Sequence, residues 1–138
     1  MTKTLKFLAA LLVALPVFAQ AQQTYTQAEL DQLLAPIAAY QDPLLSQVLM
    51  AATFPEEVSE AARWSRANPG LLGDTAVQAA QNEGWDPSVR ALVAFPRLIA
   101  YMDANPGWIR SLGEAFLIQE PQVMSTVERL RQEGRRRS

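Results

Sequence analysis

A cluster of three glutamates, Glu56, Glu57 and Glu60, stands at the start of one predicted helix. Glu56 and Glu60 would share a helix face, one turn apart. Paired carboxylates can hydrolyse glycosidic bonds, one as acid and the other as base or nucleophile. However, acidic side chains also complement the dipole at a helix N-terminus, and Arg63 can pair with Glu60. We therefore interpret the three glutamates as structural.

A single glutamate, Glu114, is the other candidate for acid–base chemistry. A buried glutamate with a raised pKa can act as a general acid, as in helical cell-wall lytic enzymes. Glu114 is two positions from both Leu112 and Phe116 in a predicted helix, which places it off the apolar stripe and in water. We predict no catalytic residue. A cell-wall (peptidoglycan) hydrolase that uses one of these carboxylates is the alternative function.

The residue types that are missing exclude most other chemistry. The sequence has no histidine and no cysteine, and its only lysines are Lys3 and Lys6. Ser-His-Asp and Cys-His sites are therefore impossible, and so are ordinary zinc sites. We predict neither a cofactor nor a metal site.

Arginine and tryptophan side chains are candidates for binding rather than catalysis. Trp85 and Trp108 stand at predicted helix starts, where core or stapling roles are favoured, whereas Trp64 is less constrained. The chain ends in closely spaced arginines, which either complement the dipole of a last helical turn or contact anionic lipid or cell-wall polymer. The predicted interaction surface consists of Arg63, Trp64, Arg66, Arg135, Arg136 and Arg137.

The first 21 residues have the pattern of a secretory signal peptide. Two lysines are followed by an apolar run over 7–18 and by small residues at 19 and 21. The run is shorter than the ~20 apolar residues of a transmembrane helix, so we expect cleavage after Ala21 or, as a close variant, after Ala19. The remaining chain has 10 arginines and 14 acidic residues, a net charge of −4, and no predicted transmembrane helix. Export and this negative charge disfavour nucleic acid as a partner.

Prolines and glycines divide the rest of the chain into segments whose apolar residues recur at helical spacing. No segment alternates with a period of two, so we predict no strands. The predicted fold is all-α, a compact array of seven or eight short, proline-punctuated helices over 22–134. It follows the cleaved leader over 1–21 and precedes a basic tail over 135–138. Each helix is too short to be stable alone, so burial of the apolar sides must hold the array together.

Residues that cap helices mark the predicted boundaries, often next to a proline at the first helical position. The predicted caps at helix starts are Asp42, Asp74, Asp86 and Asn105, with capping-box pairs Thr26–Glu29 and Thr53–Glu56. Gly84 and Gly134 are placed to end helices in a left-handed conformation.

Two segments share one pattern of caps and prolines. In each, Asp-Pro is followed by Phe-Pro and then by Ala-Asn-Pro-Gly, starting at Asp42 in the first and at Asp86 in the second. The spacings between corresponding prolines differ by 3 and 4 residues, about one helical turn. Shortening a helix by one turn keeps its apolar face in place. We therefore infer two related helix–proline–helix pairs, with chance recurrence of common cap sequences as the alternative.

Several of these runs match a family of bacterial proteins. They include Leu33-Leu34-Ala35-Pro36-Ile37, Asp42-Pro43-Leu44-Leu45 and Trp85-Asp86-Pro87-Ser88-Val89, with residues 47–52, 61–64, 91–96, 112–116 and 127–131. Over about residues 30–133 the sequence resembles the domain-of-unknown-function family numbered 3300. The resemblance implies an exported envelope protein of Gram-negative bacteria, with relatives that often continue into a long low-complexity tail. It implies no activity, ligand or catalytic residue, and Tyr40-Gln41 stands where the family more often has Tyr-Pro.

The sequence as a whole predicts a non-enzymatic interaction or structural domain in the periplasm of a Gram-negative bacterium. This prediction rests on two observations: the apolar segments are sufficient to form a core, and no group of residues in the sequence fits a known type of catalytic site. The expected partner is an envelope protein or a cell-wall component, with weak contact to anionic lipid through the arginine-rich end.

Overall fold

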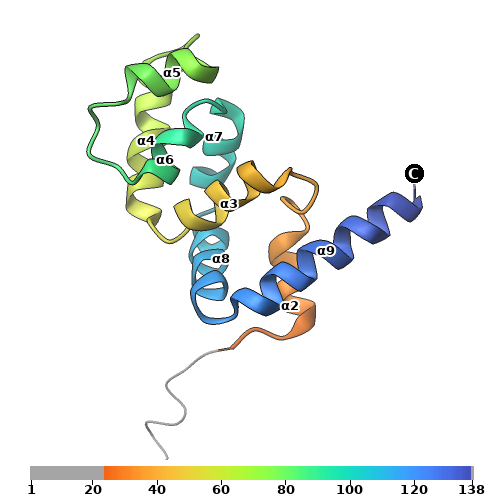
Figure 1. The fold of residues 1–138 in the computed structure, drawn as a ribbon. Helices are drawn as coiled ribbons and strands as arrows, with labels where there is room; N and C mark the ends of the chain where they lie inside the picture. The colour runs from red at the N-terminus through yellow and green to blue at the C-terminus, as the bar shows by residue number, and fades with distance from the viewer. Residues whose placement is uncertain (1–23, 138) are drawn as a thin grey trace, which may run out of the picture.

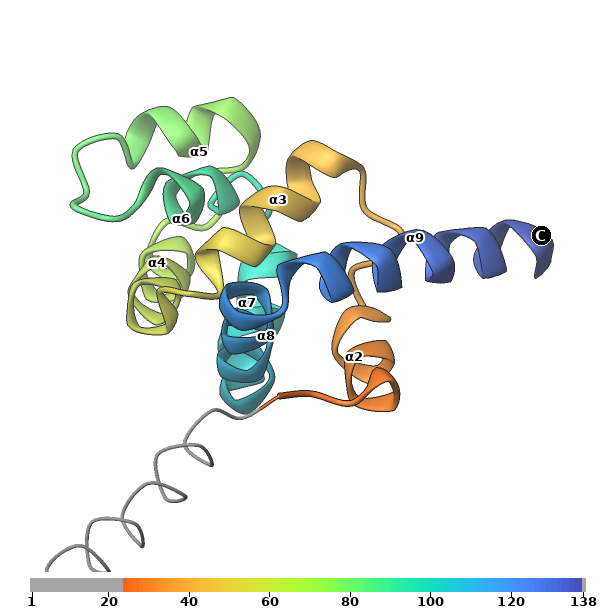
Figure 2. The same ribbon diagram turned by 60° about the horizontal axis from the view of Figure 1, so that its bottom comes forward.

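Residues 24–137 are described by the computed structural model, in which they form eight helices and no strand (Figure 1, Figure 2). The all-α class and the predicted number of helices are confirmed. No described helix is long and apolar enough to cross a membrane. The predicted leader and its cleavage site lie outside the described residues. The helices are α2 (Gln27–Leu34), α3 (Asp42–Ala51), α4 (Pro55–Ala67), α5 (Gly73–Ala79), α6 (Pro87–Leu92), α7 (Pro96–Ala104), α8 (Pro106–Ile118) and α9 (Glu120–Arg137).

The two predicted helix–proline–helix pairs are present as α3–α4 and α6–α7, and each helix packs against its counterpart. The helix that α3 contacts most extensively is α6, and the helix that α4 contacts most extensively is α7. α3 and α6 have 10 and 6 residues, and α4 and α7 have 13 and 9, so each helix of the second pair is shorter by about one turn. A one-turn difference leaves the apolar faces in the same orientation, so both copies can bury them.

The backbone at the ends of these helices also matches between the pairs. Phe54 and Phe95 precede α4 and α7, and both have a φ of −124°. Asn68 and Asn105 follow these helices with φ values of −124° and −127°. The side-chain amide of each asparagine donates a hydrogen bond of 2.8 Å to the backbone carbonyl four residues earlier. The shared sequence pattern therefore corresponds to a shared local structure.

The core is built from the apolar stripes that the sequence predicts. Its largest fully buried side chains include Leu30, Leu34, Leu45, Leu49, Leu92, Ile99, Met102, Ile109 and Leu112, each at most 2% exposed. Full burial of one such side chain stabilises a fold by about 1.5–3 kcal/mol, which lets helices that are unstable alone form together. Every buried side-chain nitrogen and oxygen in the described part of the chain has a hydrogen-bond partner.

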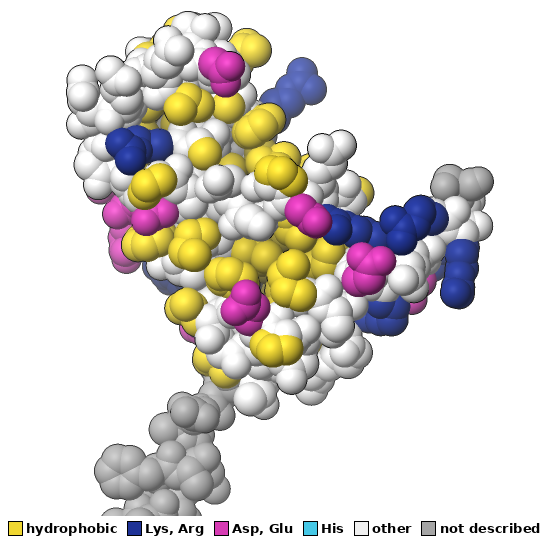
Figure 3. Space-filling model, viewed as in Figure 1, with side chains coloured by type: hydrophobic (Ala, Val, Ile, Leu, Met, Phe, Trp, Pro, Cys, Tyr) yellow, Lys and Arg dark blue, Asp and Glu magenta, His cyan; other side chains and the backbone are white. Residues whose placement is uncertain are grey.

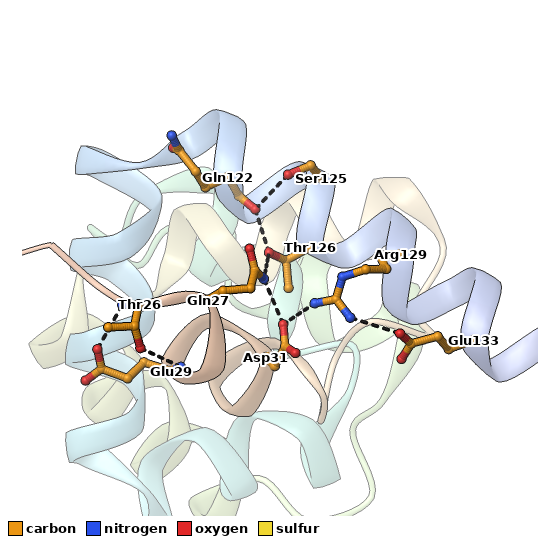
Figure 4. A network of polar contacts seen from close by, with 9 residues as sticks. All are labelled: Thr26, Gln27, Glu29, Asp31, Gln122, Ser125, Thr126, Arg129 and Glu133. Carbon is orange, nitrogen blue, oxygen red and sulfur yellow. Dashed lines mark hydrogen bonds and ion pairs between the residues drawn. The ribbon is translucent and has the colours of Figure 1, made fainter.

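Polar contacts hold α9 against α2 at one edge of this core (Figure 4). Asp31 of α2 accepts hydrogen bonds from the side-chain amide of Gln27, at 2.8 Å, and from the guanidinium of Arg129. Arg129 also pairs with Glu133 one turn later, at 2.9 Å. The hydroxyl of the buried Thr126 accepts a hydrogen bond of 2.9 Å from Gln27. Arg129 is thus engaged in packing α9, although it belongs to the basic end of the chain.

Two of the predicted start caps are confirmed. Thr26 and Glu29 form a reciprocal capping box at the start of α2. Asp86 accepts a hydrogen bond of 3.0 Å from the backbone N–H of Ser88 at the start of α6. Both acceptors satisfy N–H groups that have no partner within their own helix.

The other predicted side-chain caps are wrong, although Asn105 does occupy the N-cap position of α8, with a proline at its first turn as predicted. α3 begins at Asp42 itself, whose carboxylate accepts from Arg131 instead. Thr53 donates its hydroxyl hydrogen bond to the carbonyl of Met50, at 2.6 Å, and Phe54 occupies the cap position of α4. Neither Asn105 nor Asp74 caps a helix with its side chain. Thr53 and Asn105 have local partners instead, Asp42 has a distant one, and Asp74 lies inside the first turn of α5, none of which cap spacing alone reveals.

The predicted left-handed helix ends at Gly84 and Gly134 are also wrong. The described glycines with positive φ are Gly70, at 90° in the connection between α4 and α5, and Gly73, at 62° at the start of α5. α9 continues through Gly134, so the expected boundary between domain and tail falls inside a helix. Residues 135–137 form its last turn.

Candidate interaction groove

The glutamates at the start of α4 make structural hydrogen bonds. Glu57 accepts from the backbone N–H of Asp86 at 2.7 Å, and Glu60 accepts from the indole N–H of Trp85 at 3.1 Å. Both contacts fasten the segment before α6 to α4, and Glu56 is exposed. No group of three or more acidic side chains within residues 24–137 is placed to hold a metal ion. These contacts support the structural interpretation of the cluster.

Glu114 lies on the exposed side of α8, as its position off the apolar stripe predicts. Its carboxylate accepts a hydrogen bond of 2.6 Å from the hydroxyl of Tyr25. That hydrogen bond is the main cause that raises the pKa of Tyr25 above its ordinary value of 10.0. Gln119 accepts from the backbone N–H of Tyr25 at 2.6 Å and donates to its carbonyl at 3.1 Å. Together, Glu114 and Gln119 anchor the segment before α2.

The structure separates the two halves of the predicted interaction surface. One half lies on α4, and the other forms the last turn of α9, and in both ribbon views these are on opposite sides of the molecule (Figure 1, Figure 2). The ring of Trp64 is half-buried and packs edge-on against Trp85, with centroids 6.2 Å apart. Arg66 pairs with Asp103 at 3.2 Å. Trp64 and Arg66 make contacts within the fold and Arg63 is exposed, and these α4 residues do not join the arginines of α9 in one site.

A groove follows the segment between α2 and α3. Three hollows, of about 840, 580 and 410 Å³, adjoin there and share Tyr40. The first lies between this segment and α9, and the other two lie between the start of α3 and the corner where α6 meets α7. Figure 3 shows apolar side chains gathered over α3 and its surroundings, with arginines along α9 at the side. Hollows of this size can hold several side chains of a partner.

The end of the groove near α7 is apolar and aromatic. Phe95 and Tyr101 are 44% and 45% exposed, and the half-buried side chains of Tyr40 and Leu44 line the same hollow. The ring of Tyr101 packs edge-on against Trp108, with centroids 5.3 Å apart, which holds it in place. Large apolar side chains that remain exposed in one hollow are a mark of an interaction site.

The end of the groove near α9 is basic. Arg131 donates hydrogen bonds to the carbonyls of Ala38, at 2.8 Å, and Tyr40, and to the carboxylate of Asp42, at 2.7 Å. These contacts fix the segment between α2 and α3, so Arg131 shapes the groove wall. The charged residues lining the three hollows are Arg97, Arg131, Arg135, Arg137, Asp42 and Glu133. The groove is therefore net positive, although the chain after residue 21 is net negative.

Sequence reasoning misses the three aromatic residues of the groove. Tyr101 stands off the stripe formed by Ile99 and Met102 on α7, and an aromatic residue outside the apolar stripe is a signal that could identify it. In the sequence, Phe95 is noted only as part of the Phe-Pro motif that marks a helix boundary, and that motif does not predict whether its ring is exposed. Tyr40 lies in a connection, where periodicity carries no information about exposure.

Comparison with known proteins places the chain in a family. Residues 26–138 match the family described as "Protein of unknown function (DUF3300)". The "Uncharacterized protein YacH" of Escherichia coli (strain K12) is 51% identical over 111 residues. The match covers 80% of this chain but 18% of that relative, so the chain spans less than a fifth of the relative's length. No solved structure matches the chain. The chain belongs to the DUF3300 family, because the match to that family covers residues 26–138.

Proposed function

We propose that this chain is an exported, non-enzymatic interaction domain of the Gram-negative periplasm that binds another envelope protein through the groove. Export is supported by the leader pattern of residues 1–21. The observation that carries the binding role is the exposure of Phe95 and Tyr101 in one hollow of a net-positive groove. Aromatic and arginine side chains contribute most to the affinity of protein interfaces.

The groove favours a peptide segment of a protein over a flat lipid surface. Membrane-surface proteins insert apolar side chains that protrude into the headgroup region. Here the apolar side chains line a hollow, and a flat bilayer surface cannot reach into it to contact them. A segment with apolar side chains and acidic neighbours would match both the lining and the charge of the groove.

The alternative function, a cell-wall hydrolase, has less support. Glycoside hydrolases need two carboxyl groups that face one sugar across a cleft. Glu57 and Glu60 bind the segment before α6, and Glu114 binds Tyr25. None of these three glutamates lines the groove. Incubation with purified peptidoglycan checks this point, because fragment release that Glu114→Gln abolishes would favour the hydrolase.

Export can be tested directly by mass spectrometry of the protein from fractionated cells. We expect a periplasmic form that begins at residue 20 or 22, after cleavage at Ala19 or Ala21. A cytoplasmic protein that keeps its leader contradicts the proposed location.

Binding can be tested in cells with a photo-crosslinking amino acid in place of Phe95. The matched control carries the same amino acid in place of Arg63, which is exposed on α4 and lines none of the three hollows. We expect a protein adduct of defined mass from position 95 and none from position 63. Adducts only to lipid or to cell-wall fragments contradict a protein partner. An adduct only from position 63 would favour the surface on α4.

A further inference from the structure

A second exposed apolar surface lies where α8 ends and α9 begins. Leu117 and Ile118 are 71% and 50% exposed, and no other large apolar side chain in the described residues is as exposed as Leu117. Glu114 precedes Leu117 by three residues on the same helix face, and Glu120 begins α9. Both glutamates are exposed. We call these four residues the α8–α9 corner.

The corner and the groove are opposite in shape and in charge. Side chains as exposed as Leu117 protrude, whereas the aromatic side chains of the groove line a hollow. The corner adds two carboxylates to its apolar side chains, of which that of Glu114 also accepts from Tyr25, and the groove lining has four arginines against two acidic residues. The corner thus has the composition expected of a segment that fits the groove.

We infer that the α8–α9 corner of one copy docks in the groove of a second copy of this chain. The apolar side chains of the corner contact Tyr40, Phe95 and Tyr101, and its carboxylates face the arginines. This inference rests on the proposed function, because it names the partner of the same groove.

The contact must join two molecules and not close within one. Glu120 of the corner and Arg131 of the groove are on one continuous helix, α9, separated by eleven residues. This separation is about 16 Å along a rigid helix, so a chain cannot fill its own groove. Because each copy offers both a corner and a groove, the contact either repeats head-to-tail as an open chain or closes into a ring, of which a two-fold dimer with two such contacts is the smallest.

Sedimentation velocity of the full chain, purified from cells that express it, tests self-association. We expect the sedimentation coefficient to rise with protein concentration and the association to weaken in high salt, because exposed charges are screened. Leu117→Ser in the corner and Tyr101→Ser in the groove should each weaken association about tenfold or more. Leu72→Ser is the control, since Leu72 is 63% exposed outside both surfaces. Circular dichroism shows whether each variant stays folded.

Mixing the two variants gives the sharpest outcome. Leu117→Ser keeps an intact groove and Tyr101→Ser keeps an intact corner, so an equal mixture can form one kind of contact only. We expect each variant alone to be monomeric and the mixture to form dimers and nothing larger. A contact that joined two like surfaces would give no such rescue, and its absence overturns the docking of the corner in the groove.

The result also separates this inference from the proposed function. A chain that stays monomeric at all concentrations overturns the self-association. If the probe at position 95 still crosslinks a different periplasmic protein, the proposed binding function is supported but its partner is not a second copy of this chain. An adduct of twice the chain mass, linked to the corner, supports both proposals.

Discussion

The carbonyl oxygen of Ala52, after the end of α3, lies so close to Gly113 of α8 that a Cβ on Gly113 would be 2.4 Å from it. The obstacle is backbone, which cannot rotate away as a side chain can. We predict that Gly113→Ala lowers the free energy of unfolding by about 1–3 kcal/mol, the usual cost of overpacking. Urea unfolding followed by circular dichroism measures this change.

Gly134→Ala is the matched control for that substitution. Gly134 lies inside α9, and a Cβ there would meet nothing within 4 Å. Alanine should raise the free energy of unfolding by up to about 1 kcal/mol, because glycine is the poorer helix former. Equal effects of the two substitutions would mean that α8 does not approach α3 as described.

Arg131 should be the arginine of α9 on which the groove depends. Its guanidinium serves two backbone carbonyls and one carboxylate, and its side chain is only 19% exposed. We predict that Arg131→Met lowers the free energy of unfolding by about 1–3 kcal/mol, because two part-buried backbone carbonyls lose their donor. Hydrogen exchange of the backbone around Tyr40 should also become faster.

Arg136→Met controls for the loss of one positive charge. Arg136 is exposed in the last turn of α9, so its removal should change the free energy of unfolding by less than about 0.5 kcal/mol. If both arginine variants unfold at the same urea concentration, Arg131 does not hold the segment between α2 and α3.

The capping box of α2 should produce a pH-dependent contribution to stability. Hydrogen bonds from the backbone and the side chain of Thr26 lower the pKa of Glu29 below its ordinary value of 4.5. A carboxyl group whose pKa is lower in the folded state stabilises the fold above its unfolded pKa, and this contribution is lost as pH falls through the folded pKa. Glu29→Ala should therefore lower Tm at pH 7, and the difference from the wild type should shrink below about pH 4.5.

Gln32→Ala is the reference for this pH series, since Gln32 is an exposed, non-titrating residue of the same helix. Its effect on Tm should not vary with pH. A Glu29→Ala difference that stays constant into acid would show that the carboxylate does not cap α2.

Trp64 should act through stability and not through binding. Its half-buried ring packs edge-on against Trp85, so Trp64→Ala should lower the free energy of unfolding by about 1–3 kcal/mol. Crosslinking from position 95 should continue in this variant at temperatures where it is folded. Arg63→Ala, at the exposed neighbouring position, should change neither quantity. Loss of crosslinking in folded Trp64→Ala would place Trp64 in the binding surface.

Much of the fold could be predicted because its signals are local. The prolines after Asp86 and Phe95 mark helix starts, and the apolar stripes identify which faces are buried. The capping box at Thr26 is also local, since it joins residues three positions apart. The cap predicted at Thr53 is wrong because its hydroxyl has a competing acceptor in the preceding turn, the carbonyl of Met50.

The sequence by itself determined the helices, their order and the sides that each must bury, because hydrogen bonding and apolar periodicity act over three or four residues. Only the tertiary structure decided the groove. Arg131 reaches the carbonyl of Tyr40 from 91 residues away, and Phe95 comes beside Leu44 because α6 packs on α3. A hollow between helices depends on which helices pack together and at what distance, and the local sequence pattern of a helix does not contain this information.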